Sequence, residues 1–174
     1  MRAALSRESE VTFARVAEDH LDDVFGYLVY LAGNRTVAED LAAETFERAL
    51  RRWQRYDPRR GTPRTWLLTL ARSTALDHFR SEERRRRREG TYALRDRVDE
   101  GEIFGHGYSP AMEAALRSLS AGEREVVALR VLLDLDGETA ARLLGISPTA
   151  CSTRLSRALH KLEENVRGNA DVHA

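Results

Sequence analysis

Hydrophobic residues recur at helical spacing in the first half of the chain. Between residues 18 and 33 they follow an i, i+3, i+4, i+7 order, which predicts a helix with one buried stripe. The stripe consists of Leu21, Val24, Phe25, Leu28, Leu31 and Ala32, and Gly33 ends the helix. Thr36 and Glu39 then have the spacing of a capping box, which predicts a second helix that continues to about residue 55.

A third helix is predicted after the loop at residues 57–61. Thr62 followed by Pro63 is a favourable N-cap and N1 pair, and the apolar rhythm continues to the arginine run that ends at Arg88. Because each of these helices has one apolar face, we expect the three to form a bundle.

The apolar rhythm stops between residues 89 and 109, where glycines and acidic residues gather. A connection of about twenty residues is longer than compact domains usually contain, so it predicts a flexible, acidic linker between two domains. The expected fold class is all-α, with two small helical domains. The expected boundaries are a first domain at 1–88, the linker at 89–109, a second domain at 110–167 and a tail at 168–174.

The second domain has the pattern of a helix-turn-helix. Ser120 and Glu123 form a capping box that opens a helix to about residue 133. A short helix at 138–144, a turn at Gly145 and a last helix at about 148–166 follow it. That spacing is typical of a DNA-binding motif whose second helix lies in the major groove.

The last helix, capped by Ser147 and Pro148, has two different faces. One is apolar and includes Cys151, Leu155, Ala158, Leu159 and Leu162. The other is polar and includes Thr149, Ser152, Thr153, Ser156, Arg157 and His160. Hydroxyls and an arginine on an otherwise bare face fit base edges and phosphates, and Arg154 at the boundary is expected to meet a backbone phosphate. The alternative is an ordinary helical hairpin with a solvated polar face. Cys151 is expected to be a buried small hydrophobe.

Charge is distributed unevenly, although the net charge is zero. Residues 48–88 contain 14 arginines and 4 acidic residues, whereas residues 1–47 contain 4 arginines and 10 acidic residues. Because salt screens charges beyond about 8–10 Å, a partner would respond to the local block. Of the 28 basic residues, 27 are arginine. This favours forked contacts to phosphates, base edges or carboxylates, although GC-rich coding explains the same bias.

Aromatic residues alternate with the arginines of this block. Such a surface can bind a single strand, with guanidinium groups on phosphates and rings against unstacked bases. The rings concerned are Trp53, Tyr56, Trp66 and Phe79. Trp66 and Phe79 also follow the apolar rhythm, so packing in the core is the alternative for both. The Arg84–Arg88 run is either a solvated helix end or a set of phosphate contacts.

Several function classes are not supported by the sequence. It has no long apolar stretch, so we expect a cytoplasmic protein without membrane contact of its own. Its one cysteine cannot form an internal disulfide, and nothing near it has the spacing of metal ligands. The histidines are scattered and there is no phosphate-binding loop, so we expect neither an enzyme nor a cofactor.

Two motifs, in order, resemble those of the extracytoplasmic-function (ECF, group 4) sigma factors, the small initiation subunits of bacterial RNA polymerase. They are AEDLAAETF at 38–46 and YDPRRGTPRTWL at 56–67, and the helix-turn-helix follows them. The resemblance covers roughly residues 18–88 and 110–165. It implies that the two helical domains correspond to sigma regions 2 and 4.

The resemblance assigns the helix at 37–53 to docking on the coiled coil of the polymerase's largest subunit. Four residues would contact it: Asp40, Leu41, Glu44 and Phe46. An acidic edge beside an apolar anchor suits such a contact. The alternative is that Leu41 and Phe46 only fill the bundle.

The resemblance also implies two DNA surfaces. The loop at 57–64 and the next helix would open the minus-10 region and capture an extruded base, through Tyr56, Arg59, Arg60, Arg64, Trp66, Ser73 and Arg80. The last helix would contact the minus-35 duplex through Thr149, Ser152, Thr153, Arg154, Ser156 and Arg157. The implied partners are promoter DNA, core RNA polymerase, including its flap, and an anti-sigma protein.

Three positions depart from the family's usual pattern. The family commonly has Gln where Ala43 stands, Asn where Ser73 stands, and Lys or Arg where Ser152 stands. The last difference predicts a different or weaker minus-35 preference.

The main rival is a stand-alone helix-turn-helix regulator that binds duplex DNA as a dimer, with residues 1–88 as its dimerisation or sensing domain. The net +10 charge of residues 48–88 argues against it, because a dimerisation helix should not carry such a charge. A helical adaptor that binds only proteins is the third possibility.

Overall fold

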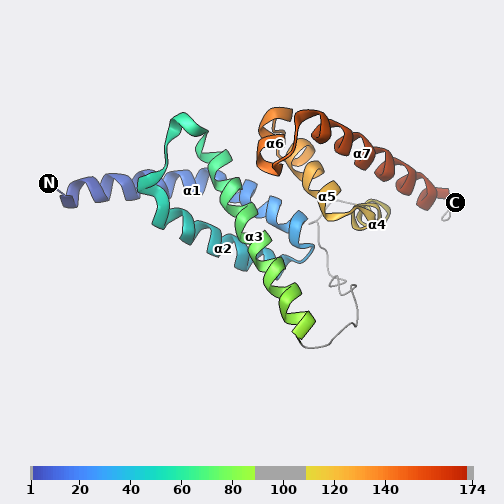
Figure 1. The fold of residues 1–174 in the computed structure, drawn as a ribbon, viewed down its shortest axis with the longest axis horizontal. Helices are drawn as coiled ribbons and strands as arrows, with labels where there is room; N and C mark the ends of the chain where they lie inside the picture. The colour runs from blue at the N-terminus through green and yellow to red at the C-terminus, as the bar shows by residue number, and fades with distance from the viewer. Residues whose placement is uncertain (1, 89–108, 172–174) are drawn as a thin grey trace. The chain divides into compact units, whose positions relative to one another are not determined.

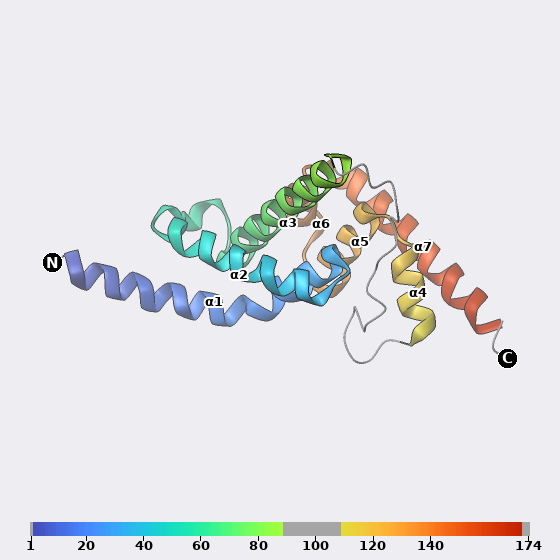
Figure 2. The same cartoon turned by 90° about the horizontal axis from the view of Figure 1, so that it is seen from below.

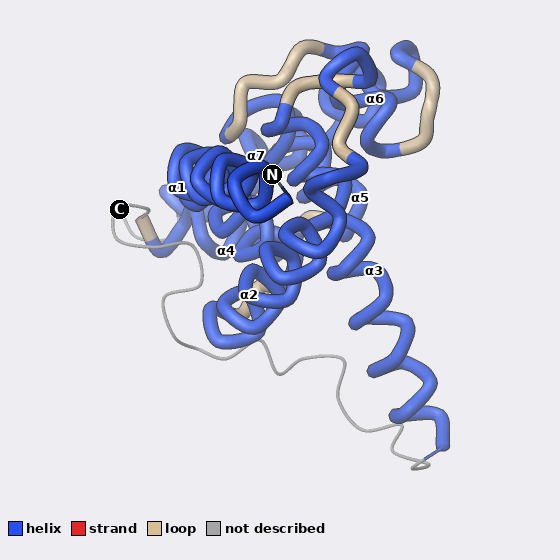
Figure 3. The backbone as a smooth tube through the Cα atoms, turned by 90° about the vertical axis from the view of Figure 1, so that its left-hand side faces the viewer, coloured by secondary structure: helices blue, strands red, loops and turns tan. Residues whose placement is uncertain are grey.

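The computed structural model describes residues 2–88 and 109–171. Within these ranges, all secondary-structure elements are helices, which loops connect (Figure 3). The chain forms two compact units, one with residues 1–28 and 36–97 and the other with residues 29–35 and 98–174. The predicted all-α class with two helical domains is confirmed. Apart from residue 109, the predicted linker lies outside the described residues.

The first unit is a bundle of three helices (Figure 1 and Figure 2). They are α1 (Arg2–Ala32), α2 (Arg35–Arg52) and α3 (Pro63–Arg88), with the short 3₁₀ helices η1 (Trp53–Arg55) and η2 (Pro58–Arg60) between α2 and α3. Residues 29–35, at the end of α1 and the start of α2, are grouped with the second unit. The centre of the bundle includes six large hydrophobic side chains that are at most 2% exposed: Val24, Tyr27, Leu28, Leu41, Leu67 and Leu68. Each helix therefore buries one face, as the sequence pattern predicts.

Two details of this unit differ from the prediction. Leu21 is 50% exposed, because periodicity identifies a face but not how far along the helix that face is covered. The predicted capping box is wrong, since α2 already begins at Arg35 and Thr36 lies in its first turn. The connection is this short because Gly33 has a φ of 61°, in the left-handed region that ends α1 at once.

The cap predicted for α3 is confirmed. The Thr62 hydroxyl accepts a hydrogen bond from the backbone N–H of Thr65 at 3.2 Å, and Pro63 is the first residue of the helix. This fixes the point at which the loop between α2 and α3 becomes helical.

The second unit contains four α-helices, whose buried side chains form a small core, and Figure 1 shows their arrangement. They are α4 (Pro110–Ser118), α5 (Ala121–Val127), α6 (Gly137–Leu144) and α7 (Pro148–Asp171), and α7 contacts the other three. Each begins at a serine or aspartate whose side chain accepts a backbone N–H: Ser109, Ser120, Asp136 and Ser147. The predicted helix-turn-helix is present as α6 and α7. Its turn is Gly145, with a φ of 68°.

The helix predicted to continue from the Ser120 cap to about residue 133 is interrupted. α5 ends at Val127 and continues as a π-helical segment, η3 (Ala128–Leu132). The wider turn changes which residues face inward, so Leu129 is buried whereas Val131 is 56% exposed. Regular 3.6-residue spacing could not predict this change.

None of the helices in the described ranges is long and apolar enough to cross a membrane.

The capping box of α5 supplies a test of the second unit. Glu123 accepts the Ser120 backbone N–H at 2.7 Å and also pairs with Lys161 of α7 at 3.3 Å. The hydrogen bond from the Ser120 backbone is the main cause that lowers the pKa of Glu123 below its ordinary value of 4.5. A lowered carboxyl pKa stabilises the fold at pH above 4.5, and the contribution is lost as the pH falls through the folded-state pKa.

We therefore expect Glu123→Gln to destabilise the second unit by about 0.5–1 kcal/mol at pH 7. Hydrogen exchange of the α5 and α7 amides measures this, because both tryptophans lie in the first unit. The difference from the wild type should shrink as the pH falls below 4.5. An equal difference at pH 7 and pH 3 would contradict the assignment.

Candidate nucleic-acid interface

Aromatic side chains support the loop between α2 and α3. The Trp53 ring stacks on Tyr56, with centroids 5.1 Å apart and an interplanar angle of 5°, and Trp66 packs at a tilt against both rings. The Tyr56 hydroxyl donates to the Gly61 carbonyl at 2.8 Å, which closes the loop. Burial is the main cause that raises the pKa of Tyr56, and Asp57 adds to it, so the hydroxyl keeps its proton.

The tip of this loop exposes two arginines. Asp57 accepts hydrogen bonds from the Arg59 backbone at 3.0 Å and from its guanidinium at 3.1 Å. The guanidinium contact is the main cause that lowers the pKa of Asp57, so the carboxylate stays ionised. The Arg59 side chain is nevertheless 90% exposed, and Arg60 is exposed too. Both predicted residues are therefore accessible to a ligand.

Arg64 has a different environment from its neighbours in the loop. Its Nε lies 2.6 Å from Asp23 Oδ2 of α1, and the two side chains are only 29% and 32% exposed. His20 Nδ1 lies 3.8 Å from the same oxygen. The pair fixes the start of α3 to α1. Asp23 was not predicted from the sequence, because the partners are 41 residues apart.

The other predicted minus-10 residues lie along α3. Trp66 is half-buried within the aromatic cluster, whereas Ser73 and Arg80 are exposed. Arg80 lies 3.7 Å from Asp77. The final run, Arg84–Arg88, is exposed along its whole length. The loop tip and α3 thus place basic side chains on the outside of one unit.

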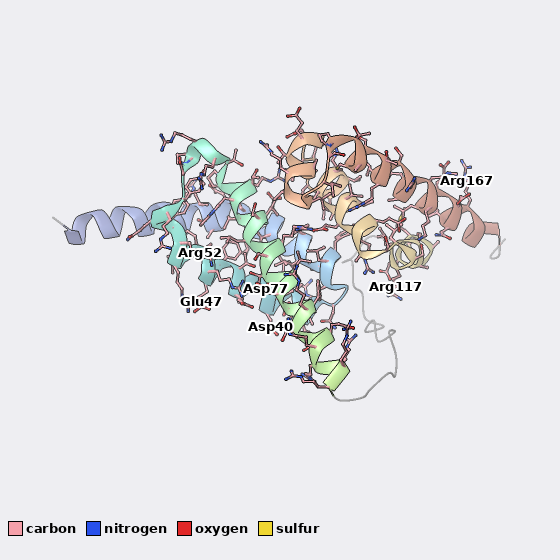
Figure 4. The ribbon with its side chains drawn as sticks, viewed as in Figure 1. Asp40, Glu47, Arg52, Asp77, Arg117 and Arg167 are labelled. Carbon is pink, nitrogen blue, oxygen red and sulfur yellow. The ribbon has the colours of Figure 1, made fainter. Side chains whose placement is uncertain are left out.

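The predicted polymerase-docking residues of α2 have unequal exposure. Asp40 is exposed (Figure 4), and Phe46 is half-buried. Glu44 lies 2.5 Å from Arg48, which also bonds to α3. Leu41 is only 2% exposed and packs inside the bundle, in agreement with the alternative given above, so it cannot touch a partner directly.

The two faces of α7 largely agree with the prediction. Cys151 and Ala158 are buried, at 1% and 0% exposed. The polar face is exposed at all six predicted positions: Thr149, Ser152, Thr153, Ser156, Arg157 and His160. Leu159, which the spacing places on the apolar face, is 43% exposed. It lies about 100° around the helix from Ala158, on a flank that the neighbouring helices leave open.

Arg154 is half-buried and lies against the start of α5. A methyl group at Gly122 would be 3.4 Å from its Nη1 atom. No local sequence pattern indicates this contact, because α5 and α7 are far apart along the chain.

No group of three or more potential metal-ligating side chains occurs in the described part of the chain. The site is instead a set of guanidinium and hydroxyl groups on two helical units. A basic loop and helix, together with a helix-turn-helix whose second helix has a bare polar face, are typical of DNA-binding proteins.

Comparison with known proteins agrees with this class. The Sigma-70 region 2 family matches residues 16–85, and the Sigma-70 region 4 family matches residues 110–162. The ECF RNA polymerase sigma factor BldN of Streptomyces coelicolor is 34% identical over 86% of this chain, which spans 58% of BldN. The ECF RNA polymerase sigma factor EcfG of Rhodopseudomonas palustris is 33% identical over 78% of this chain and 75% of EcfG.

The chain belongs to the ECF RNA polymerase sigma factors, which act in promoter-specific transcription initiation. Its fold is also similar to that of the sigma factor RpoE from Bartonella quintana, solved in complex with the anti-sigma factor NepR. The TM-score is 0.77 at 22% identity, over 90% of this chain and 97% of RpoE.

The hydrogen bond that closes the loop can be tested by substituting Tyr56. Tyr56→Phe removes the hydrogen bond to the Gly61 carbonyl but keeps the ring stack on Trp53. We expect the first unit to lose about 1 kcal/mol of stability. Urea unfolding followed by tryptophan fluorescence measures this unit alone, since both tryptophans belong to the aromatic cluster. Tyr56→Ala should lower the stability further, because the ring stack on Trp53 is lost as well. A urea midpoint of Tyr56→Phe equal to that of the wild type would contradict a stabilising role of the Tyr56–Gly61 hydrogen bond.

Proposed function

We propose that this protein binds core RNA polymerase and directs initiation through two DNA surfaces used at the same time. The first unit binds the opened strand of the minus-10 region, and the second unit binds the minus-35 duplex. The observation that carries this proposal is that both units expose basic or hydroxyl side chains. In each unit these side chains lie on helix faces opposite to the faces that pack in the core. We assign the first role to residues 1–88 and the second to residues 110–167.

The loop between α2 and α3 suits a single strand. Its backbone is closed by Tyr56 and Gly61, so Arg59 and Arg60 are presented from an ordered support. Guanidinium groups bind phosphates of an unpaired strand, and an extruded base requires a nearby pocket or ring. The aromatic cluster lies directly behind the loop, where it fixes the loop's shape.

Along α3, the basic surface continues away from the loop. Ser73 and Arg80 are exposed, and the Arg84–Arg88 run follows them. Because each phosphate contact releases counterions, binding through this surface should weaken steeply with salt.

For the polymerase contact we propose the exposed edge of α2. Asp40 and Glu44 supply negative charge, and the half-buried Phe46 offers apolar area beside them. Charged edges accelerate encounter, and aromatic anchors supply much of the affinity of an interface. Leu41 supports this edge from inside the bundle.

For the duplex contact we propose the polar face of α7. Ser152, Thr153, Ser156 and Arg157 are exposed in successive turns, on the side away from Cys151 and Ala158. An α-helix fits the major groove, where hydroxyl and guanidinium groups contact base edges. Thr149 lies at the start of the same face.

Two further expectations belong to this proposal. The RpoE structure was solved with an anti-sigma factor, and we propose that an inhibitory protein of this kind also binds the present chain. We place the protein in the cytoplasm, where its template and polymerase are, and assign it no catalytic step. A dimeric regulator without polymerase is not favoured, because the arginine-rich block of the first unit would oppose self-association.

The direct test is transcription with purified core polymerase and a promoter selected from genomic fragments. We expect transcripts only when this protein is added. The variant Arg59→Gln/Arg60→Gln should reduce transcript yield about tenfold or more, because two charge-assisted contacts are lost. The slope of log yield against log salt should become shallower by about 1.4, for two single-strand phosphates.

The matched control is Arg15→Gln/Arg167→Gln. It removes the same charge from two exposed positions, each ion-paired within its own helix and away from the proposed surfaces. It should transcribe like the wild type. Equal losses in both variants would show a general charge effect and contradict the assignment of the loop.

A further inference from the structure

The first turn of α3 carries a positive charge that its own residues do not balance. Arg64 is the second residue of the helix, and the sequence of this turn, residues 63–66, includes no acidic side chain. The N-terminal end of an α-helix has a partial positive charge, so an arginine at this position is unfavourable. A carboxylate from another part of the chain can offset both charges.

Asp23 of α1 supplies this carboxylate. Its Oδ2 atom accepts a hydrogen bond from Arg64 Nε at 2.6 Å, across 41 residues of sequence. Both side chains are more than two-thirds buried, so water screens their attraction less than it would at an open surface. Val24, the next residue of α1, is fully buried in the core, which fixes the place of the carboxylate.

The ion pair attaches the loop between α2 and α3 to a third helix. Two other contacts at the end of this loop are local, because each joins residues at most five positions apart. They are the Thr62 cap of α3 and the hydrogen bond from Tyr56 to Gly61. The Arg64–Asp23 pair instead reaches α1. It therefore determines where the loop, with the arginines at its tip, lies relative to that helix.

Arg64 and Arg59 are suited to different roles. The Arg59 side chain is 90% exposed, and its partner Asp57 belongs to the same loop. A phosphate that drew the Arg64 guanidinium away from Asp23 would leave a largely buried carboxylate without this partner. Removing one partner of a buried ion pair is strongly unfavourable. The geometry therefore favours Arg64 as an anchor of the loop.

We propose that Asp23 is a positioning residue for the capture of the opened strand. It acts through Arg64, which anchors the loop to α1 and does not itself bind a phosphate. The inference rests on the proposed function and divides the arginines of the loop by role. Arg59 and Arg60 contact the strand, whereas Arg64 fixes the support from which they project.

Three variants test the anchor in the reconstituted holoenzyme. They are Asp23→Asn, Arg64→Gln and the combination of both. The measurement is transcript yield at several salt concentrations, and urea unfolding followed by tryptophan fluorescence gives the stability of the first unit for each variant.

Two controls separate positioning from stability and from charge. Val24→Ala removes buried methyl groups beside Asp23, so it destabilises the same unit without changing the ion pair. Asp19→Asn removes a carboxylate from α1 one turn earlier, where Asp19 pairs with Arg15 of its own helix. Both controls should transcribe like the wild type under conditions in which the first unit is folded.

We expect Asp23→Asn and Arg64→Gln each to lower transcript yield about fivefold. The combined variant should lose no more than either single variant, because both act through one contact. The slope of log yield against log salt should stay at the wild-type value in all three, since no phosphate contact is lost. In the same assay, the slope of Arg59→Gln/Arg60→Gln should be shallower by about 1.4.

Four results would overturn the anchor. A slope shallower by about 0.7 in Arg64→Gln would make Arg64 a contact to one single-strand phosphate. A yield above the wild type in Asp23→Asn would mean that Asp23 competes with the strand for Arg64. A similar loss in Val24→Ala at a matched urea midpoint would reduce the effect to stability, and wild-type yield in both single variants would remove any role.

Failure of the anchor can be distinguished from failure of the proposed function. If Asp23→Asn does not fold, Arg64→Gln decides the question. Unchanged yield and slope in Arg59→Gln/Arg60→Gln would contradict the proposed strand contact instead. Hydrogen exchange of the Thr65 amide, which the Thr62 hydroxyl accepts, would still test the anchor. We expect faster exchange in Asp23→Asn than in the wild type, and equal rates would contradict the anchor.

Discussion

The packing of α7 against α4, α5 and α6 is the constraint on which the second unit depends. Cys151 and Ala158 are buried on one face, and their small side chains let the helix lie close to its neighbours. Once this face is fixed, the opposite face must remain bare. The apolar contacts hold in one orientation the hydroxyls and the arginine of that bare face, which we propose as a DNA surface.

In the first unit, ion pairs between helices help to fix the orientation of the helices. Arg64 binds Asp23 across α1 and α3, and Arg48 binds Asp77 across α2 and α3. These arginines hold the bundle together, whereas Arg59 and Arg60 project from the loop. Arginines of one sequence block therefore differ in environment: Arg48 and Arg64 pair between helices, whereas Arg59 and Arg60 are exposed at the loop.

Local signals predicted much of the fold. The Thr62–Pro63 cap, the Ser120–Glu123 capping box and the Ser147 cap all begin helices where the sequence indicated, because each involves residues within three positions of one another. Signals that depend on tertiary context failed. Leu21 and Leu159 follow the apolar spacing of their helices but are 50% and 43% exposed, and the π-helical turn after Val127 has no simple pattern.

The candidate site divides in the same way. The exposed positions of α7 followed from helical spacing, and the basic character of α3 followed from the charge count along the chain. Three contacts that hold these side chains in place could not be predicted from the sequence pattern, because each depends on the path of the folded chain. They are the Asp23–Arg64 ion pair, the Tyr56–Gly61 hydrogen bond and the packing of Arg154 against Gly122. Leu41, although part of a recognised motif, is likewise a core residue here.

The central claim is that both units contact one promoter at the same time while polymerase fixes the distance between them. It is tested most directly by transcript yield from templates in which the spacer between the upstream duplex site and the opened region changes one base pair at a time. Each base pair moves one site by about 3.4 Å and rotates it by about a tenth of a turn. We predict a sharp optimum, with a severalfold or larger loss for a change of one or two base pairs. A yield that stays constant across several spacer lengths would contradict the account.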